Sequence, residues 1–126
     1  MARKILIVED DTDIGKALSV RLNSSGYETV VVADGYEAVC AISDEKPDLM
    51  LLDLGLPLGD GYDIMEHMKA KGIFSEVPVI VLSARDPARN QERALKAGAK
   101  AFLQKPADNN ELLAAIRAAL QEPDSH

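Results

Sequence analysis

The chain has 126 residues, 47% of them hydrophobic and 28% charged, which is the composition of one ordinary globular domain. Its 21 acidic and 14 basic residues give a formal net charge of −7, which argues against direct binding of nucleic acid or of an anionic membrane surface. The sequence contains neither a signal peptide nor an apolar stretch near the roughly 20 residues that span a bilayer, so we expect a cytoplasmic protein.

Short aliphatic runs alternate with amphipathic segments along the chain. The runs predict strands at 5–8, 29–32, 49–52, 79–82 and 101–104. Apolar residues at helical spacing predict a helix after each strand, namely around 14–22, between 35 and 46, from about 64 to 71, over 87–97 and around 112–120. The second of these helices contains the only cysteine, Cys40, whose apolar neighbours predict a small core residue rather than a reactive thiol, a disulfide or a zinc ligand.

Strands that alternate with helices predict an α/β fold with a parallel sheet covered on both faces. Five such units are too few for an eight-stranded barrel, so we expect a doubly wound, flavodoxin-like (βα)5 sheet with strand order 2-1-3-4-5. The weaker second and fifth runs are expected at its edges. One domain should span residues 1–122, followed by a polar tail at 123–126.

Asp53 is the most informative residue, because it ends the aliphatic run 49–52 and begins a turn rich in glycine. Acidic residues are depleted in strands, and burying their charge costs free energy, so an acidic residue at such a position usually has a function. Other predicted strands also lead into polar residues at their carboxyl ends. These are Glu9, Asp10 and Asp11 after the first strand, Ser83 after the fourth, and Lys105 with Pro106 after the fifth. In a doubly wound sheet they would meet at one edge, where ligands bind.

Each of these residues also has an ordinary structural explanation: an acid caps a helix or forms a turn, a serine bonds a loop, and a lysine is a solvated charge. Their shared edge favours a site instead. Clustered carboxylates repel one another, and Mg²⁺ would relieve that repulsion. Asp53 would then act as a nucleophile toward phosphorus, with Lys105 and Ser83 binding the phosphoryl oxygens. No Walker A loop or nucleotide fingerprint is present, so ATP is not the expected donor.

The sequence resembles the receiver domain of two-component response regulators over essentially its whole length. The resemblance rests on residues 5–11 (ILIVEDD), on 47–54 (PDLMLLDL) with Pro57 and Asp60-Gly61, on 78–84 (PVIVLSA), and on Gly98-Ala99 through the stretch FLQKP at 102–106. It implies a chemotaxis-type, flavodoxin-like fold and a phospho-accepting signalling switch of a phosphorelay rather than a turnover enzyme.

By position, the resemblance implies that Asp53 accepts a phosphoryl group from a sensor histidine kinase or a phosphotransfer protein. It also implies a Mg²⁺ site in which Asp10 and Asp53 are direct ligands and Glu9 binds through water. The backbone carbonyl of Gly55 would be a further ligand. Asp11, one position beyond the acidic pair, is better interpreted as a helix-start residue.

The resemblance further implies that Ser83 moves to bond the phosphoryl group and that Lys105 pairs with it. The Lys105–Pro106 peptide bond is expected to be cis, a state accessible mainly before proline. Phe102 matches a switch aromatic that rotates inward when Ser83 shifts, although it could also be a plain core aromatic. A downstream output protein or domain would then read the surface formed by the fourth helix, the fifth strand and the fifth helix.

Several positions depart from the commoner choices of this family. Gly55 and Arg85 flank the acceptor, so both should influence how long a phosphoryl group persists. Ala107 and the pair Lys100-Ala101 replace residues often seen at a dimer surface, so we expect a monomer or a weak phosphorylation-dependent dimer. Two other classes stay open: a receiver-like interaction module that is not phosphorylated, and a small flavin- or nucleotide-binding protein. The cognate kinase and the output pathway have no signature in the sequence.

Overall fold

The computed structural model describes residues 2–56, 60–73 and 76–122. Pro57 and the predicted tail at 123–126 lie outside these residues. The elements in chain order are β1 Lys4–Val8, α1 Thr12–Ser24, β2 Glu28–Val32, α2 Gly35–Glu45, β3 Leu49–Leu52, α3 Gly61–Ala70, β4 Val79–Ser83, α4 Pro87–Lys96, β5 Ala101–Gln104 and α5 Asn109–Leu120. Every predicted strand and helix is therefore found, with shifts of a few residues at the helix ends.

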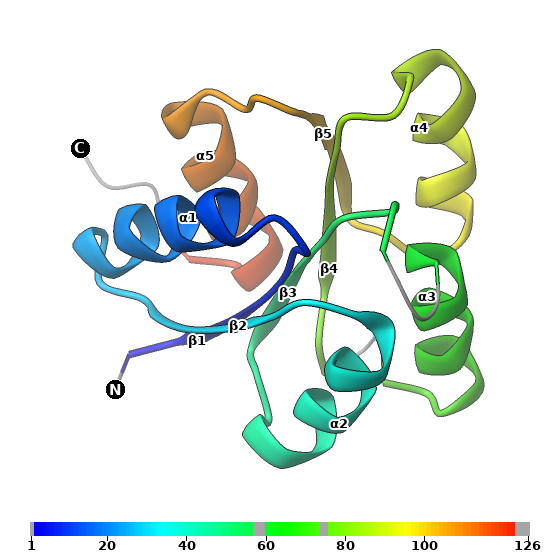
Figure 1. Cartoon of the computed structure of the whole chain (residues 1–126), viewed down its shortest axis with the longest axis horizontal. Helices are drawn as coiled ribbons and strands as arrows, with labels where there is room; N and C mark the ends of the chain where they lie inside the picture. The colour runs from blue at the N-terminus through cyan, green and yellow to red at the C-terminus, as the bar shows by residue number, and fades with distance from the viewer. Residues whose placement is uncertain (1, 57–59, 74–75, 123–126) are drawn as a thin grey trace.

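The sheet is parallel and has the strand order β2-β1-β3-β4-β5, which confirms the predicted flavodoxin-like topology. The central strands β3 and β4 are buried along their whole length, whereas β2 and β5 lie at the edges and are partly exposed. Helices α1 and α5 cover one face, and α2, α3 and α4 cover the other (Figure 1). Because the strands are parallel, the residues that follow them meet at one edge of the sheet.

Each helix in the described part of the chain begins at an aspartate whose carboxylate accepts a hydrogen bond from a backbone N–H of the first turn. These residues are Asp11, Asp34, Asp60, Asp86 and Asp108. An aspartate at this position satisfies a free backbone donor and suits the positive end of the helix dipole. The caps therefore define where each strand-to-helix connection ends, which limits the freedom of the loops at the carboxyl edge.

The prediction that Cys40 is a core residue is wrong, because the side chain is exposed. Helix α2 buries Ala38, Ala41 and Ile42, which lie three or four residues apart on one side of the helix. Cys40 lies two residues from both Ala38 and Ile42, so the helical turn of about 100° per residue directs it to the opposite side. Among the described helices, none combines the length and the apolar composition needed to cross a membrane.

Tyr27 joins the start of β2 to the end of α5. Its ring is only 8% exposed, and its hydroxyl donates a 2.7 Å hydrogen bond to Oε1 of Glu122. Burial, together with the hydrogen bond to and the charge of Glu122, raises the pKa of Tyr27 to about 12 from 10.0. As the pH rises, the Tyr27 hydroxyl therefore loses its proton at a lower pH in the unfolded chain than in the folded chain. The contribution of Tyr27 to stability is complete below pH 10 and is lost as the pH rises through about 12.

We therefore expect the Tyr27→Phe variant to lose less stability than the wild type when the pH is raised from 10 to 12. Urea unfolding followed by circular dichroism at a series of pH values measures this difference. Other lysines and tyrosines titrate in the same range, but they are common to both proteins and cancel in the comparison. Parallel pH profiles for the two proteins would contradict the assignment.

Candidate functional site

Asp53 stands at the carboxyl end of β3, in the centre of the sheet. Its backbone N–H donates a 3.1 Å hydrogen bond to the carbonyl of Val8, which extends the pairing of β3 with β1 by one residue. Its side chain is 13% exposed, so it is largely covered by protein but still reaches solvent. The backbone N–H of Gly55 donates to Oδ1 of Asp53 at 3.3 Å. The buried strand and the following turn thus orient one carboxylate toward the edge of the sheet.

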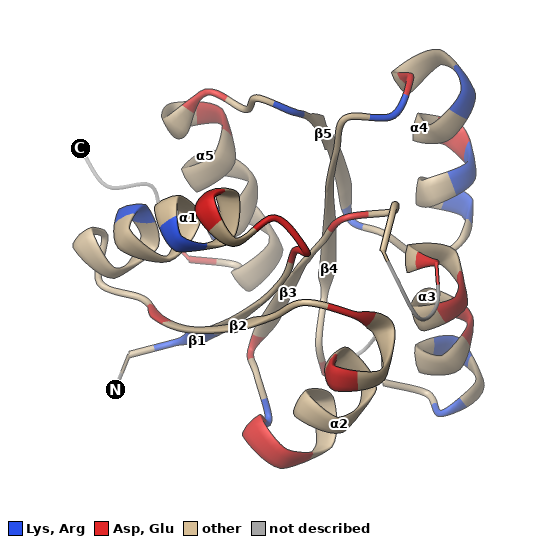
Figure 2. Cartoon of the chain, viewed as in Figure 1, with Lys and Arg blue, Asp and Glu red and all other residues tan. Residues whose placement is uncertain are grey.

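Two further carboxylates lie beside Asp53. One carboxylate oxygen from each of Glu9, Asp10 and Asp53 falls within 4.8 Å of the others, so the three can share one cation. Glu9 is 4% exposed and Asp10 is exposed, which makes the group open to solvent on the side of Asp10. Figure 2 shows acidic residues following both β1 and β3 at the same end of the sheet. Asp11, in contrast, serves as the cap of α1 and accepts from the N–H of Ile14.

Lys105 provides a positive charge between these acids. Its ammonium donates a hydrogen bond to Oε1 of Glu9 and another, of 3.3 Å, to Oδ2 of Asp53. Its backbone N–H donates to the carbonyl of Ser83 at 2.9 Å, which ties the end of β5 to the end of β4. The peptide bond between Lys105 and Pro106 is cis. Lys105 therefore contacts the acidic residues through its side chain, and it contacts β4 through its backbone.

Burial and the neighbouring charges shift the pKa values of Glu9 and Lys105. Burial raises the pKa of Glu9 and the charge of Asp53 adds to this effect, although the hydrogen bond from Lys105 opposes it. Burial lowers the pKa of Lys105, but the hydrogen bonds to Glu9 and Asp53 and their charges outweigh it, so the pKa is raised. One ammonium thus stays protonated while it is shared between carboxylates. A divalent cation would complete the charge balance.

Ser83 and Phe102 lie on the neighbouring strands. Ser83 is fully buried at the end of β4, and its Oγ accepts a 3.0 Å hydrogen bond from the backbone N–H of Arg85. Its hydroxyl therefore stabilises the β4–α4 connection. Phe102 is aligned with Val81 in the register of β4 and β5, and it packs, partly buried, against the apolar cluster beneath α2, α3 and α4. The carbonyl of Ser83 accepts a hydrogen bond from the backbone of Lys105, and β5, which contains Phe102, packs against α4.

A set of contacts between the start of α3 and the region of α4 was not predicted from the sequence. Nη2 of Arg85 lies 3.2 Å from Oδ2 of Asp60, the capping residue of α3. The hydroxyl of Tyr62 bonds Oδ1 of Asn90 at 3.0 Å, and the guanidinium of Arg93 lies 3.7 Å from the centre of the Tyr62 ring. The Asp60-x-x-Asp63 spacing is a readable capping signal, but nothing in the sequence indicates a partner for Asp60 in another loop.

Comparison with known proteins agrees with this geometry. The sequence model of the response regulator receiver domain matches residues 5–117. The chain is 36% identical over 124 residues to the DNA-binding response regulator MtrA of Mycobacterium tuberculosis, a match that covers 98% of this chain and 53% of MtrA. The chain thus spans about half the length of the curated relatives it matches.

Solved structures give the same result for the fold. A response regulator from Chloroflexus aurantiacus superposes with a TM-score of 0.90 at 29% identity, covering 97% of this chain and 100% of the other. The receiver domain of a sensor histidine kinase from Pseudomonas aeruginosa, which has a magnesium ion coordinated in its active site cleft, superposes with a TM-score of 0.85 at 31% identity, covering 97% and 100%.

Proposed function

This chain belongs to the response regulator receiver domain family, and from that premise we propose that Asp53 is the phosphoacceptor of a two-component signalling switch. The observation that supports this assignment best is the position of the Asp53 carboxylate, which lies against Lys105 and within one cation's reach of Glu9 and Asp10. The donor would be the phosphohistidine of a sensor kinase or of a phosphotransfer protein. The receiver unit would span residues 1–122.

In the proposed reaction, an Oδ atom of Asp53 attacks the phosphorus of the donor. A new O–P bond forms, the bond from phosphorus to the donor atom breaks, and its electron pair leaves with the donor. Lys105 would bind a phosphoryl oxygen and compensate its charge, and Ser83 would turn its hydroxyl from Arg85 N–H toward the same group. The phosphoryl group then stays covalently attached to Asp53, so the protein would act as a signalling switch rather than as a turnover enzyme.

The acidic group would hold Mg²⁺ during this reaction. We assign Asp10 and Asp53 as direct ligands, Glu9 as a ligand through water, and the Gly55 carbonyl as a further ligand. The close approach of the three carboxylates supports this assignment, since their oxygens suit a hard cation. Bound there, Mg²⁺ would neutralise charge that accumulates on the phosphoryl oxygens.

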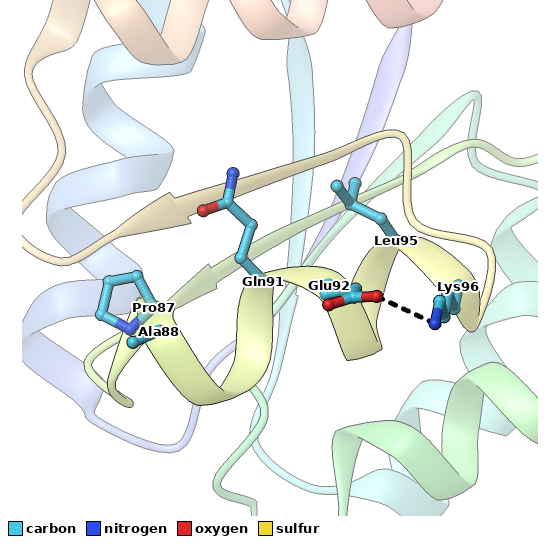
Figure 3. Close-up of a pocket in the computed structure, with 6 residues that line it drawn as sticks. All are labelled: Pro87, Ala88, Gln91, Glu92, Leu95 and Lys96. Atoms are coloured by element: carbon cyan, nitrogen blue, oxygen red, sulfur yellow. Dashed lines mark ion pairs between the residues drawn. The ribbon is translucent and has the colours of Figure 1, made fainter.

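The output surface would be α4, β5 and α5. When Ser83 moves, Phe102 would follow it inward and alter this surface for a downstream protein or domain. Figure 3 shows six residues along α4 that line a pocket, among them Leu95, which is 42% exposed, and the ion pair of Glu92 with Lys96. Among the described residues of α4, Ala94 alone is buried, so most of the helix surface is open to contact by a partner. The chain itself would be a monomer or a weak phosphorylation-dependent dimer.

The metal requirement provides the direct test of this function. Acetyl phosphate with Mg²⁺ is expected to add one phosphoryl group to the chain, as seen by intact mass. Removal of Mg²⁺ with EDTA should slow labelling at least about tenfold, since metal stabilisation of phosphoryl charge is worth several kcal/mol. Readdition of Mg²⁺ in excess should restore the rate. Equal labelling with and without EDTA would contradict the metal site, and no labelling in either condition would favour an unphosphorylated interaction module.

A further inference from the structure

An ion pair joins the two loops on either side of the acceptor. Arg85 lies in the β4–α4 connection and Asp60 at the start of α3, and Nη2 of Arg85 is 3.2 Å from Oδ2 of Asp60. The two side chains are 38% and 39% exposed. A pair this exposed contributes little stability, because water screens its attraction. The guanidinium is therefore held in one place by a contact that is easily exchanged.

The guanidinium of this pair lies over Gly55. A Cβ atom on Gly55 would be 3.8 Å from Nη2 and 3.9 Å from Nε of Arg85. Gly55 also donates its N–H to the Asp53 carboxylate, and the N–H of Arg85 donates to Ser83. Arg85 is thus attached by its backbone to one phosphoryl-binding residue, while its head group lies on the turn that contacts the acceptor. The guanidinium therefore lies at ordinary van der Waals distance from the turn at Gly55.

Phosphorylation increases the negative charge at Asp53. The single negative charge of the Asp53 carboxylate is replaced by a phosphoryl group of about −1.5 to −2. Lys105, the other cation of the site, is already shared between Glu9 and Asp53. A planar guanidinium can bind two phosphoryl oxygens in bidentate fashion, and the larger negative charge of the phosphoryl group strengthens the attraction. The new group therefore competes with Asp60 for Arg85.

Asp60 can release Arg85 without losing the hydrogen bond by which it caps α3. Its Oδ1 accepts from the N–H of Tyr62 at 2.9 Å, while Oδ2 faces Arg85. The N–H groups and the dipole of α3 continue to stabilise the carboxylate after the arginine leaves. The exchange thus leaves no unpaired buried charge behind.

Resting on the proposed function of Asp53, we propose that Arg85 is a phosphoryl-binding residue held in reserve by Asp60. On phosphorylation the guanidinium leaves Asp60 and pairs with the phosphoryl group on Asp53. Asp60 is a positioning residue, and its competition for Arg85 reduces the affinity of the site for the phosphoryl group.

A double-mutant cycle on binding of beryllium fluoride, a phosphoryl analogue, tests this exchange. The affinity is measured with Mg²⁺ present by amide NMR, using the Gly55 resonance. Arg85→Gln should weaken binding about tenfold, the size of a charge-assisted hydrogen bond. Asp60→Asn should strengthen binding up to about fivefold, the size of a half-exposed ion pair, while asparagine keeps the cap of α3. The Asp60→Asn effect should vanish when Arg85→Gln is also present.

Two control variants separate this exchange from other effects. Asp86→Asn removes the same charge from another capping residue of this edge, next to Arg85 in sequence, and should leave the affinity unchanged. Arg85→Lys should bind with intermediate affinity, because lysine keeps the positive charge but lacks the planar guanidinium that donates two parallel hydrogen bonds. If Asp60→Asn strengthens binding equally in the presence and in the absence of Arg85, the loss of the Asp60 charge acts on the phosphoryl analogue directly. That result would refute the exchange. If the wild type gives no response to beryllium fluoride or to acetyl phosphate, the proposed function itself fails.

Discussion

Replacing Asp53 with asparagine is expected to abolish phosphorylation of the chain. The neutral amide has no anionic oxygen to attack phosphorus, and the substitution also removes one of three carboxylates that lie within 4.8 Å of one another. Intact mass after incubation with acetyl phosphate and Mg²⁺ measures the result. The wild type should gain one phosphoryl group, and Asp53→Asn should gain none.

Asp86→Asn is the matched control for this loss. Asp86 also follows a strand at the carboxyl edge, and its carboxylate caps α4 by accepting from the N–H of Ala88. Asparagine can keep that cap, so the control should be labelled like the wild type. If Asp53→Asn were labelled at the wild-type level, the acceptor would be another residue, and peptide mapping of the labelled protein would identify it.

Replacing Gly61 with alanine is expected to have the largest effect on stability. A Cβ atom at this position would lie 2.8 Å from the carbonyl oxygen of Asp53 and 2.8 Å from Cα of Leu54. Both are backbone atoms, so the start of α3 and the end of β3 would have to separate. The N–H of Gly61 also donates to the carbonyl of Leu54 at 2.9 Å, and this bond would lengthen. Overpacking of this kind costs about 1–3 kcal/mol.

Urea unfolding followed by circular dichroism measures this cost, and the rate of labelling shows whether Asp53 has been displaced. Gly55→Ala is the control, because its Cβ atom would make only ordinary contacts of 3.8 and 3.9 Å with Arg85. We expect Gly55→Ala to unfold at the wild-type urea concentration and Gly61→Ala at a lower one. Equal midpoints would show that the connection between β3 and α3 adjusts without strain.

Most of the architecture could be predicted from local sequence patterns. Runs such as 49–52 and 79–82 are aliphatic at every position, which is typical of strands buried on both faces, and they form the central strands β3 and β4. Met65 and Met68 of α3 are fully buried. Cys40 was misplaced because its apolar neighbours concealed the fact that it lies on the other side of α2. The division at residue 122 stays a prediction.

Local sequence patterns place five residues at the carboxyl edge, because each ends a strand or lies within two positions of a strand's end: Glu9, Asp10, Asp53, Ser83 and Lys105. Parallel pairing then leaves them no other place. The contacts among these side chains, in contrast, depend on how the folded elements pack. Lys105 could have faced solvent, but the ends of β1, β3 and β5 bring its ammonium between Glu9 and Asp53.

The pairing of Arg85 with Asp60 was likewise decided by the fold. These residues lie in different loops, 25 positions apart, and neither loop carries a sequence pattern that predicts a contact with the other. Their contact depends on how α3 packs against the end of β3, where Gly61 allows close approach, and on the bare surface at Gly55. Periodicity specifies which side of an element is buried, whereas contacts between the tips of separate loops depend on the distances that packing imposes.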